Sequence, residues 1–146
     1  MLNAVSASLE KELRNTLPKS AFPSMSANYL TEPRGIFQGK SGLLIAPETT
    51  EQVSFVVGKA NEERIGIIPF GGGTGLVGGQ ILRSRFGKTA TPIILSLERM
   101  NSIRGSYPSE DVIIVDAGVI LSHVQSHATA LDRLFPLSLA SKGSAQ

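Results

Sequence analysis

The chain has 146 residues, of which 41% are hydrophobic and 18% charged, and it carries a net charge of +2 with no cysteine and no tryptophan. Length and composition fit one soluble globular domain or one piece of a larger one, and the small charge does not indicate nucleic acid or an anionic membrane as a partner. The absence of cysteine excludes disulfides, thiolate nucleophiles and cysteine-based metal sites.

The N-terminus, MLNAVSASLEKEL, lacks a charged segment followed by a continuous apolar stretch, and it carries Glu10 and Glu12. We therefore expect neither a signal peptide nor a transit peptide. The longest apolar run near the C-terminus, VIIVDAGVIL, is short and is interrupted by Asp116, so no membrane-spanning helix is expected. These features predict a cytoplasmic protein.

The first 42 residues predict one helix and then a long loop. An apolar residue recurs every four positions from Val5 to Leu13, and Pro18 ends the pattern, which predicts an amphipathic helix over residues 5–16. Residues 18–42 are rich in proline and glycine and are expected to form a loop with at most one short extended piece. The residues expected to anchor this loop on a core are Tyr29 and Leu30.

The next segment predicts a strand, a helix and a second strand. The strands are Leu43–Ala46 and Ile65–Phe70, and the helix between them runs through residue 62, with a capping box formed by Thr49 and Gln52. Strands joined by such a crossover helix lie parallel. The predicted buried stripe of this helix consists of Val53, Val56, Val57 and Ala60.

The remaining elements predict an α+β fold that begins with an α/β-type unit and continues with a mixed sheet. Apolar runs at Ile93–Leu97 and Val112–Ala117 predict strands, and a short strand is expected at Ile103–Tyr107. The turn at Pro108–Asp111 predicts that the last two strands are antiparallel. A helical stripe of Leu121, Val124, Ala128 and Leu131 then ends near Phe135.

A glycine-rich loop directly follows the second predicted strand. The stretch IIPFGGGTGLVGGQ, residues 67–80, contains six glycines within positions 71–79. Each ordered glycine costs roughly 0.5–1 kcal/mol relative to alanine, so six cost about 3–6 kcal/mol. This loop leaves the carboxyl end of a strand, where open α/β sheets commonly bind ligands. Bare backbone is therefore expected to be needed for binding.

Three kinds of phosphate-binding loop are compared. A P-loop fails because Gly39-Lys40-Ser41 and Gly87-Lys88-Thr89 lack the first glycine at the required spacing. The G-x-G-x-x-G pattern at residues 73–78, with Glu98 twenty residues beyond, fits a nicotinamide-binding Rossmann module. However, the segment ILRSRFGKTATP leaves no room for the crossover helix that this module needs.

The third kind is a glycine nest, in which successive main-chain N–H groups surround an anion without a helix. Consecutive glycines at 71–73 permit positive φ angles and close approach to a diphosphate, and Thr74 adds a hydroxyl donor. Leu76 and Val77 are expected to point inward and fix the loop to the core. This interpretation predicts an open cleft beside the loop amides.

The residues of this loop and its flanks resemble a known family. IPFGGGTGLVGG resembles the pyrophosphate loop of the FAD-binding domain of the vanillyl-alcohol oxidase and p-cresol methylhydroxylase (PCMH-type) superfamily. The flanking stretches LLIAPETTEQV, IILSLERMNSI, DVIIVDAGVILSHV and LFPLSLASKGSAQ follow in the same order as in that family. The branch that is most similar contains the D-lactate, glycolate and D-2-hydroxyglutarate dehydrogenases.

The resemblance implies an FAD-binding domain over residues 28–146, incomplete at its C-terminus and preceded by a helix and linker at residues 1–27. It implies FAD as the ligand, bound noncovalently because the glycine loop contains no histidine. The implied cofactor-binding residues are Pro69, Gly71, Gly72, Gly73, Thr74, Gly75, Gly78, Gly79, Gln80, Pro136, Gly143 and Ser144.

The implied function is that of the N-terminal part of an FAD-dependent oxidoreductase that oxidises a D-2-hydroxy acid by hydride transfer to flavin. The small hydroxy-acid substrate would bind only in an intact protein, and no residue of this chain is assigned to catalysis. Two alternatives stay open, namely a truncated non-catalytic fragment and an NAD(P)-binding Rossmann module.

The remaining polar residues favour structural roles. His123 and His127 share one helix face, but two ligands are too few for a metal site, and a surface pair is expected. Arg83, Arg85 and Lys88 are expected to form an exposed basic turn, with screening of a diphosphate as the alternative. Turn and strand-end solvation is expected for Glu110, Asp111 and Asp116.

Overall fold

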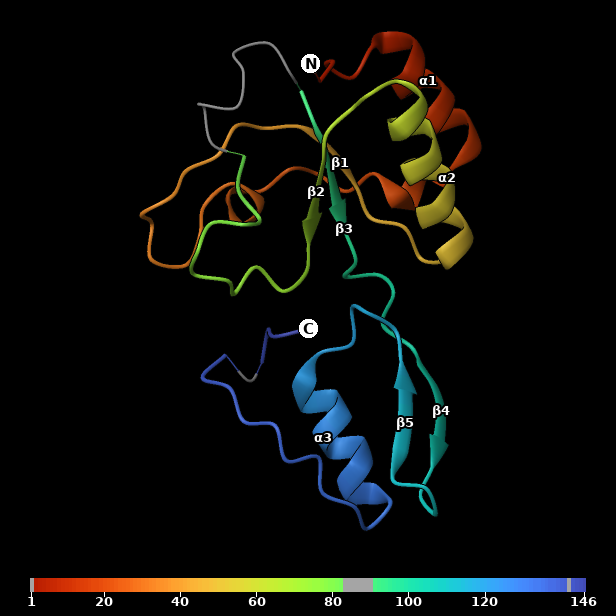
Figure 1. The fold of residues 1–146 in the computed structure, drawn as a ribbon, viewed down its shortest axis with the longest axis vertical. Coiled ribbons are helices and arrows are strands. Elements are labelled where there is room, and N and C mark those ends of the chain that lie inside the picture. The colour runs from red at the N-terminus through yellow and green to blue at the C-terminus, as the bar shows by residue number, and fades with distance from the viewer. Residues whose placement is uncertain (1, 83–90, 142) are drawn as a thin grey trace.

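The computed structural model describes residues 2–82, 91–141 and 143–146. Figure 1 shows two parts stacked along the long axis of the molecule. In the described ranges, one part contains a three-stranded sheet and two α-helices, and the other contains a two-stranded hairpin and one α-helix. In chain order the elements are α1 (Ala7–Thr16), η1 (Lys19–Ala21), η2 (Ala27–Tyr29), β1 (Leu43–Ile45), α2 (Thr50–Glu62), β2 (Ile67–Phe70), β3 (Ile93–Ser96), β4 (Ile103–Tyr107), β5 (Val112–Val115) and α3 (Leu121–Ala130).

The first part is organised around a parallel sheet with the strand order β1-β3-β2. Ile93 of β3 pairs with Leu43 of β1 on one side and with Ile67 of β2 on the other. The parallel direction of β1 and β2 is as predicted, but the sequence pattern did not indicate that β3 inserts between them. This central position places the carboxyl ends of β2 and β3 next to each other.

The two faces of this sheet are covered differently, because successive side chains of a strand point to opposite sides. α1 and α2 cover one face, and the long loop after α1 covers the other (Figure 1). The strand residues buried with the helices are Leu43, Ile45, Ile93 and Leu95. The cluster on the other face contains Tyr29, Leu44, Phe70 and Ile94. Tyr29 thus anchors the loop on the core, as its sequence position suggested.

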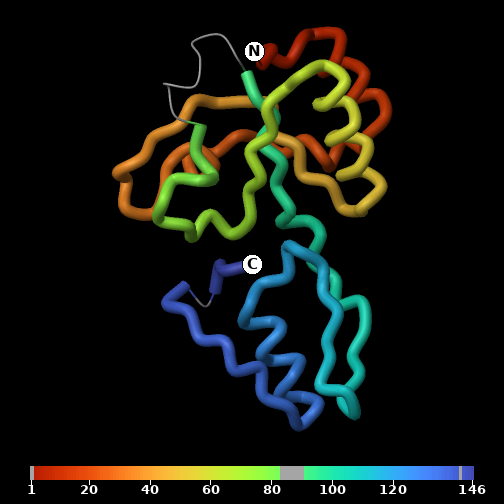
Figure 2. Tube along the Cα trace, in the orientation of Figure 1, coloured from red at the N-terminus to blue at the C-terminus, as the bar shows by residue number. Residues whose placement is uncertain are grey.

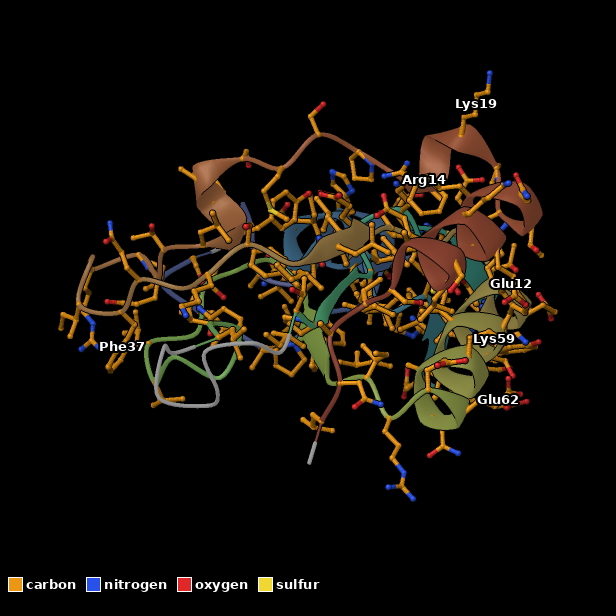
Figure 3. The ribbon with its side chains drawn as sticks, turned by 90° about the horizontal axis from the view of Figure 1, so that it is seen from above. Glu12, Arg14, Lys19, Phe37, Lys59 and Glu62 are labelled. Atoms are coloured by element: carbon orange, nitrogen blue, oxygen red, sulfur yellow. The ribbon has the colours of Figure 1, made fainter. Side chains whose placement is uncertain are left out.

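The two helices of the first part are capped and joined by an ion-pair network. Thr49 accepts a hydrogen bond from the amide of Gln52, which confirms half of the predicted capping box, while the Gln52 side chain accepts from the amide of Glu48. Lys59 lies 2.9 Å from Glu12 and 3.1 Å from Glu62, side by side in Figure 3. Hydrogen bonds to these two carboxylates raise the pKa of Lys59.

The second part consists of the antiparallel hairpin β4–β5 with α3 beside it. Figure 2 shows the chain crossing into this part in the segment after β3, and the C-terminus returning to the boundary between the parts. The crossing is fixed by Gly118, whose amide donates to the Met100 carbonyl at 2.8 Å. A Cβ at this position would overlap the Leu97 carbonyl oxygen. Glycine is therefore required where the two parts meet.

Several details differ from the sequence predictions, besides shifts of one or two residues at the ends of α1, β1, β2 and β3. Val57 lies on the exposed side of α2, because only Val56 and Ala60 of the predicted stripe are fully buried. α3 ends at Ala130 rather than near Phe135. β5 ends at Val115, before Ala117. Asp116 is buried instead of solvated, since it pairs with Arg104 and accepts a hydrogen bond from the Ser102 amide at 3.3 Å.

Across residues 2–82, 91–141 and 143–146, every helix is too short or too polar to span a lipid bilayer.

The contact at Gly118 generates the first prediction. Gly118→Ala should lower the free energy of unfolding by roughly 1–3 kcal/mol, because the backbone must move to admit the methyl group. Gly58→Ala is the matched control, since Gly58 is exposed within α2 with nothing within 4 Å of the position that a methyl group would take, and it should raise stability by up to about 1 kcal/mol. Urea denaturation of both variants measures this. Wild-type stability in Gly118→Ala would contradict it.

Candidate functional site

A cavity of about 420 Å³ lies at the boundary between the two parts, against the glycine loop. Five segments line it: the loop around η2, the end of β2 with the loop after it, the link after β3, the residue before α3 and the C-terminal segment. The lining residues are Ser26, Asn28, Tyr29, Thr31, Pro33, Phe70, Gly71, Gly72, Gly73, Thr74, Glu98, Ile120, Gly143, Ser144 and Gln146. The cleft that the glycine-nest interpretation requires is therefore present.

The loop amides beside this cavity are free to bind a ligand. Within residues 2–82, 91–141 and 143–146, the main-chain N–H groups of Gly71, Gly72, Gly73, Thr74 and Gly75 donate no hydrogen bond to the protein. Four of these five residues line the cavity. A row of free donors at the edge of a cavity is suited to an anion such as a diphosphate.

The structure gives different reasons for the individual glycines. A Cβ on Gly72 would overlap the carbonyl oxygen of Ser144, so the glycine is required for contact between the loop and the C-terminal segment. Gly73 has φ +69°, and its Cβ would also lie 2.8 Å from the ring of Phe70. Gly78 is buried with φ +74°. The positive φ angles expected for residues 71–73 are thus found only at Gly73.

The second half of the loop is held by hydrogen bonds rather than by apolar contacts. Leu76 and Val77 are 46% and 84% exposed, so the prediction that they point into the core was wrong. Instead, the Gln80 side chain donates to the carbonyls of Gly73 at 3.3 Å and Gly75 at 2.7 Å. The Arg34 guanidinium donates to the carbonyl of Leu76. Polar groups contact the loop through its carbonyls and leave its amides available.

Arg34 is positioned by a buried carboxylate. Glu32 is fully buried and accepts hydrogen bonds from the amides of Arg34 at 3.0 Å and Ile36 at 2.7 Å. Burial disfavours the charged form, but these amides and the guanidinium of Arg34 outweigh it and keep the pKa of Glu32 below its ordinary value. The turn around Glu32 is therefore a rigid support for the glycine loop.

A tyrosine–carboxylate pair forms another wall of the cavity. The hydroxyl of Tyr29 donates to Oε1 of Glu98 at 2.6 Å, and the ring of Tyr29 packs on Phe70 with the ring centroids 4.8 Å apart. Burial, together with the hydrogen bond to Glu98 and its charge, raises the pKa of Tyr29 to about 12. Tyr29 is thus a hydrogen-bond donor at neutral pH.

The residues assigned from the family resemblance fall into three groups. Those that line the cavity are Gly71, Gly72, Gly73, Thr74, Gly143 and Ser144. Gly75, Gly78, Gly79 and Gln80 shape the loop without lining the cavity. Pro69 is exposed on β2, and Pro136 lines a different cavity. Gly143 and Ser144 follow the glycine loop by more than 60 residues in the sequence, so only the tertiary structure places them beside it.

That different cavity, of about 460 Å³, lies between the β4–β5 hairpin and the chain after α3. His127 is half-buried at its wall and lies 2.7 Å from the hydroxyl of Ser106, while His123 is exposed. The two histidines therefore differ in environment. Arg133 contacts the Pro108 carbonyl and Asp111 across the hairpin turn. The expected basic turn of Arg83, Arg85 and Lys88 lies outside the described residues.

Sequence reasoning missed several lining residues. Asn28 belongs to no motif, and Ile120 and Gln146 lie in family-like stretches but were not assigned to the site. Glu98 stood out in the sequence only as the acidic residue of the Rossmann alternative. The sequence pattern indicated Tyr29 as a core anchor but not as part of the site. Its position in a proline-rich loop gave no signal for its contact with Glu98, 69 residues later.

Comparison with known proteins gives a family match over residues 42–146, to the FAD binding domain. A putative mitochondrial D-lactate dehydrogenase of Schizosaccharomyces pombe is 34% identical over 130 residues, which cover 89% of this chain and 24% of that protein. A mitochondrial D-2-hydroxyglutarate dehydrogenase of Danio rerio is 35% identical over 107 residues, which cover 73% of this chain and 19% of that protein.

A solved structure of alkyldihydroxyacetonephosphate synthase has the same fold, with a TM-score of 0.81 at 16% identity, over 99% of this chain and 28% of that one. The chain thus spans between 19% and 28% of the length of each of these proteins. The fold is that of the PCMH-type FAD-binding domain, as the sequence resemblance implied, and it is partial.

The raised pKa of Tyr29 generates the second prediction. In a Tyr107→Phe background, the tyrosinate absorbance of Tyr29 should titrate at about 12 rather than at the ordinary 10. The pKa of Tyr29 is higher in the folded state than in the unfolded state, so protonated Tyr29 contributes to the stability of the fold below pH 10. This contribution is lost as the pH rises from about 10 through 12. Tyr29→Phe should remove this part of the alkaline destabilisation. Titration of Tyr29 near 10 would contradict the buried hydrogen bond.

The contact between Gly72 and Ser144 generates the third prediction. Gly72→Ala should displace the C-terminal segment and lower the free energy of unfolding by roughly 1–3 kcal/mol. The readout is hydrogen exchange at the Leu121 amide, which donates to the Ala145 carbonyl at 2.8 Å and should exchange faster. Gly79→Ala is the control, because nothing lies within 4 Å of its Cβ position. Equal exchange in both variants would refute the contact.

Proposed function

The chain belongs to the FAD binding domain family, and from this premise we propose that its glycine loop holds the diphosphate of FAD. The observation that carries the proposal is the row of free amides from Gly71 to Gly75, beside a cavity of about 420 Å³. Glycine at residues 72 and 73 permits the backbone conformation that keeps these amides at the edge of the cavity, because a Cβ would overlap the Ser144 carbonyl or the Phe70 ring. The donor set matches the chemistry of a diphosphate.

The residues that would hold the cofactor are mostly neutral donors. The amides of Gly71, Gly72 and Gly73 and the amide and hydroxyl of Thr74 would contact the phosphate oxygens, and the segment around Ser144 would close the other side. Among the described residues that line the cavity there is no lysine, arginine or histidine. Among the described residues, the donors available to the diphosphate are therefore oriented dipoles.

We further propose that the chain is the N-terminal part of an FAD-dependent oxidoreductase that acts on a D-2-hydroxy acid. The support is the similarity to proteins named D-lactate and D-2-hydroxyglutarate dehydrogenases. Bound FAD would supply the hydride acceptor for oxidation of the substrate's α-carbon. The role of this chain's own residues is to bind and orient the cofactor, and no residue of it is assigned to the chemical step.

Three finer features are also proposals. Noncovalent binding is supported by the glycine loop, which contains no histidine as an attachment point. A cytoplasmic location was expected from the sequence of the N-terminus, whereas several relatives are named as mitochondrial proteins. The division between a leading segment at residues 1–27 and the FAD-binding domain likewise rests on the sequence resemblance.

Ligand-dependent stabilisation tests the proposed function. FAD at about 100 times its Kd should raise the free energy of unfolding by about 2.7 kcal/mol, since a ligand that binds only the folded state stabilises that state. The melting temperature should rise by roughly 5–10 °C. Riboflavin, which lacks the diphosphate, should give a much smaller rise. No shift with FAD would favour a fragment that binds no cofactor, and a shift with NAD⁺ alone would favour the nicotinamide alternative.

A further inference from the structure

In the part of the chain that the structure describes, one charged side chain lines the cavity, and its negative charge repels a diphosphate. Among the described lining residues, Glu98 is the only lysine, arginine, histidine, aspartate or glutamate. It lies in the link after β3, whereas the free amides belong to the loop after β2. Because β2 and β3 are neighbours in the sheet, both groups face the same cavity. A bound diphosphate therefore has to contact the amides and avoid the carboxylate.

The Glu98 carboxylate is oriented on one side and free on the other. Oε1 accepts the hydroxyl of Tyr29 at 2.6 Å, and Tyr29 is itself held by its packing on Phe70. Across the described ranges, Oε2 has no hydrogen-bond donor, and no cationic side chain lies within the 4.0 Å of an ion pair. An anchored carboxylate with one open oxygen can accept a further hydrogen bond from a ligand.

FAD has hydroxyl groups on both sides of its diphosphate, on the ribose of the adenosine half and on the ribityl chain of the flavin half. A carboxylate accepts hydrogen bonds and donates none, so hydroxyl groups match it and phosphate oxygens do not. We propose that Glu98 is a hydroxyl-recognition residue of this cavity, oriented by Tyr29 to accept a hydrogen bond from a sugar or ribityl hydroxyl adjacent to the diphosphate. This inference rests on the proposed function.

The same chemistry occurs in an unrelated fold. In Rossmann modules, a carboxylate close to a glycine-rich phosphate loop accepts the 2′-hydroxyl of ribose. Here the carboxylate follows the neighbouring strand, and the loop lacks the crossover helix of that fold. What the two sites share is the pairing of N–H groups for the phosphates with a carboxylate for the hydroxyls. Glu98 thus provides selectivity for a complete nucleotide over an inorganic anion.

Calorimetric titration of the 146-residue chain tests this inference with FAD, ADP, 2′,3′-dideoxy-ADP and FMN. The variants are Glu98→Gln, which keeps the side-chain shape, and Tyr29→Phe, which removes only the orienting hydroxyl. Glu110→Gln is the control for loss of one negative charge, because Glu110 is exposed in the β4–β5 turn. If Glu98 contacts the ribose, wild type should prefer ADP to dideoxy-ADP about tenfold, and Glu98→Gln should bind both nearly equally.

If Glu98 instead contacts the ribityl chain, Glu98→Gln should weaken FAD and FMN about tenfold and leave ADP unchanged. Tyr29→Phe should have a smaller effect in the same direction, about threefold, and Glu110→Gln should bind as wild type does. Equal weakening of all ligands by Glu98→Gln, or no weakening of any, would overturn the inference while leaving FAD binding intact. Failure of wild type to bind FAD would instead refute the proposed function itself.

Discussion

The contact between the glycine loop and the C-terminal segment is the constraint on which the site depends. The Gly72 backbone lies so close to the Ser144 carbonyl that no side chain fits at residue 72. This contact joins the loop after β2 to a segment that also hydrogen-bonds α3, through the Leu121 amide and the Ala145 carbonyl. The cavity exists because these two segments meet at the boundary between the sheet and the β4–β5–α3 part.

The glycines of the loop have several physical functions, and a single explanation for all six is incorrect. One permits a backbone contact, two adopt positive φ angles, and the amides from Gly71 to Gly75 are free. Polar side chains hold the loop through its carbonyls, as Gln80 and Arg34 do. The hydrogen bonds that order the loop are therefore made to its carbonyls, and the amides proposed to bind the ligand take no part in them. An ordered row of donors has less entropy to lose on binding than a flexible one.

Periodicity predicted most elements of the fold because the strands are short apolar runs and the helices carry clear stripes. It did not predict that β3 is central, since strand order depends on contacts between distant segments. Val57 and Asp116 were misassigned for a related reason. The type of a single residue, apolar or charged, does not reveal whether distant segments of the chain cover its side chain. The glycine loop was predictable from local sequence. The pair of Tyr29 and Glu98 was not, because 69 residues separate its members.

Amide chemical shifts of the glycine loop test the central claim most directly. Glycine amides form a distinct group in ¹H–¹⁵N correlation spectra, so Gly71, Gly72 and Gly73 can be followed individually during a titration with FAD. The account predicts large, saturable shifts of these amides and of Thr74, with little change in the exposed α2 glycine at residue 58. Saturable binding of FAD that leaves the loop amides unshifted would contradict the claim that they hold the diphosphate.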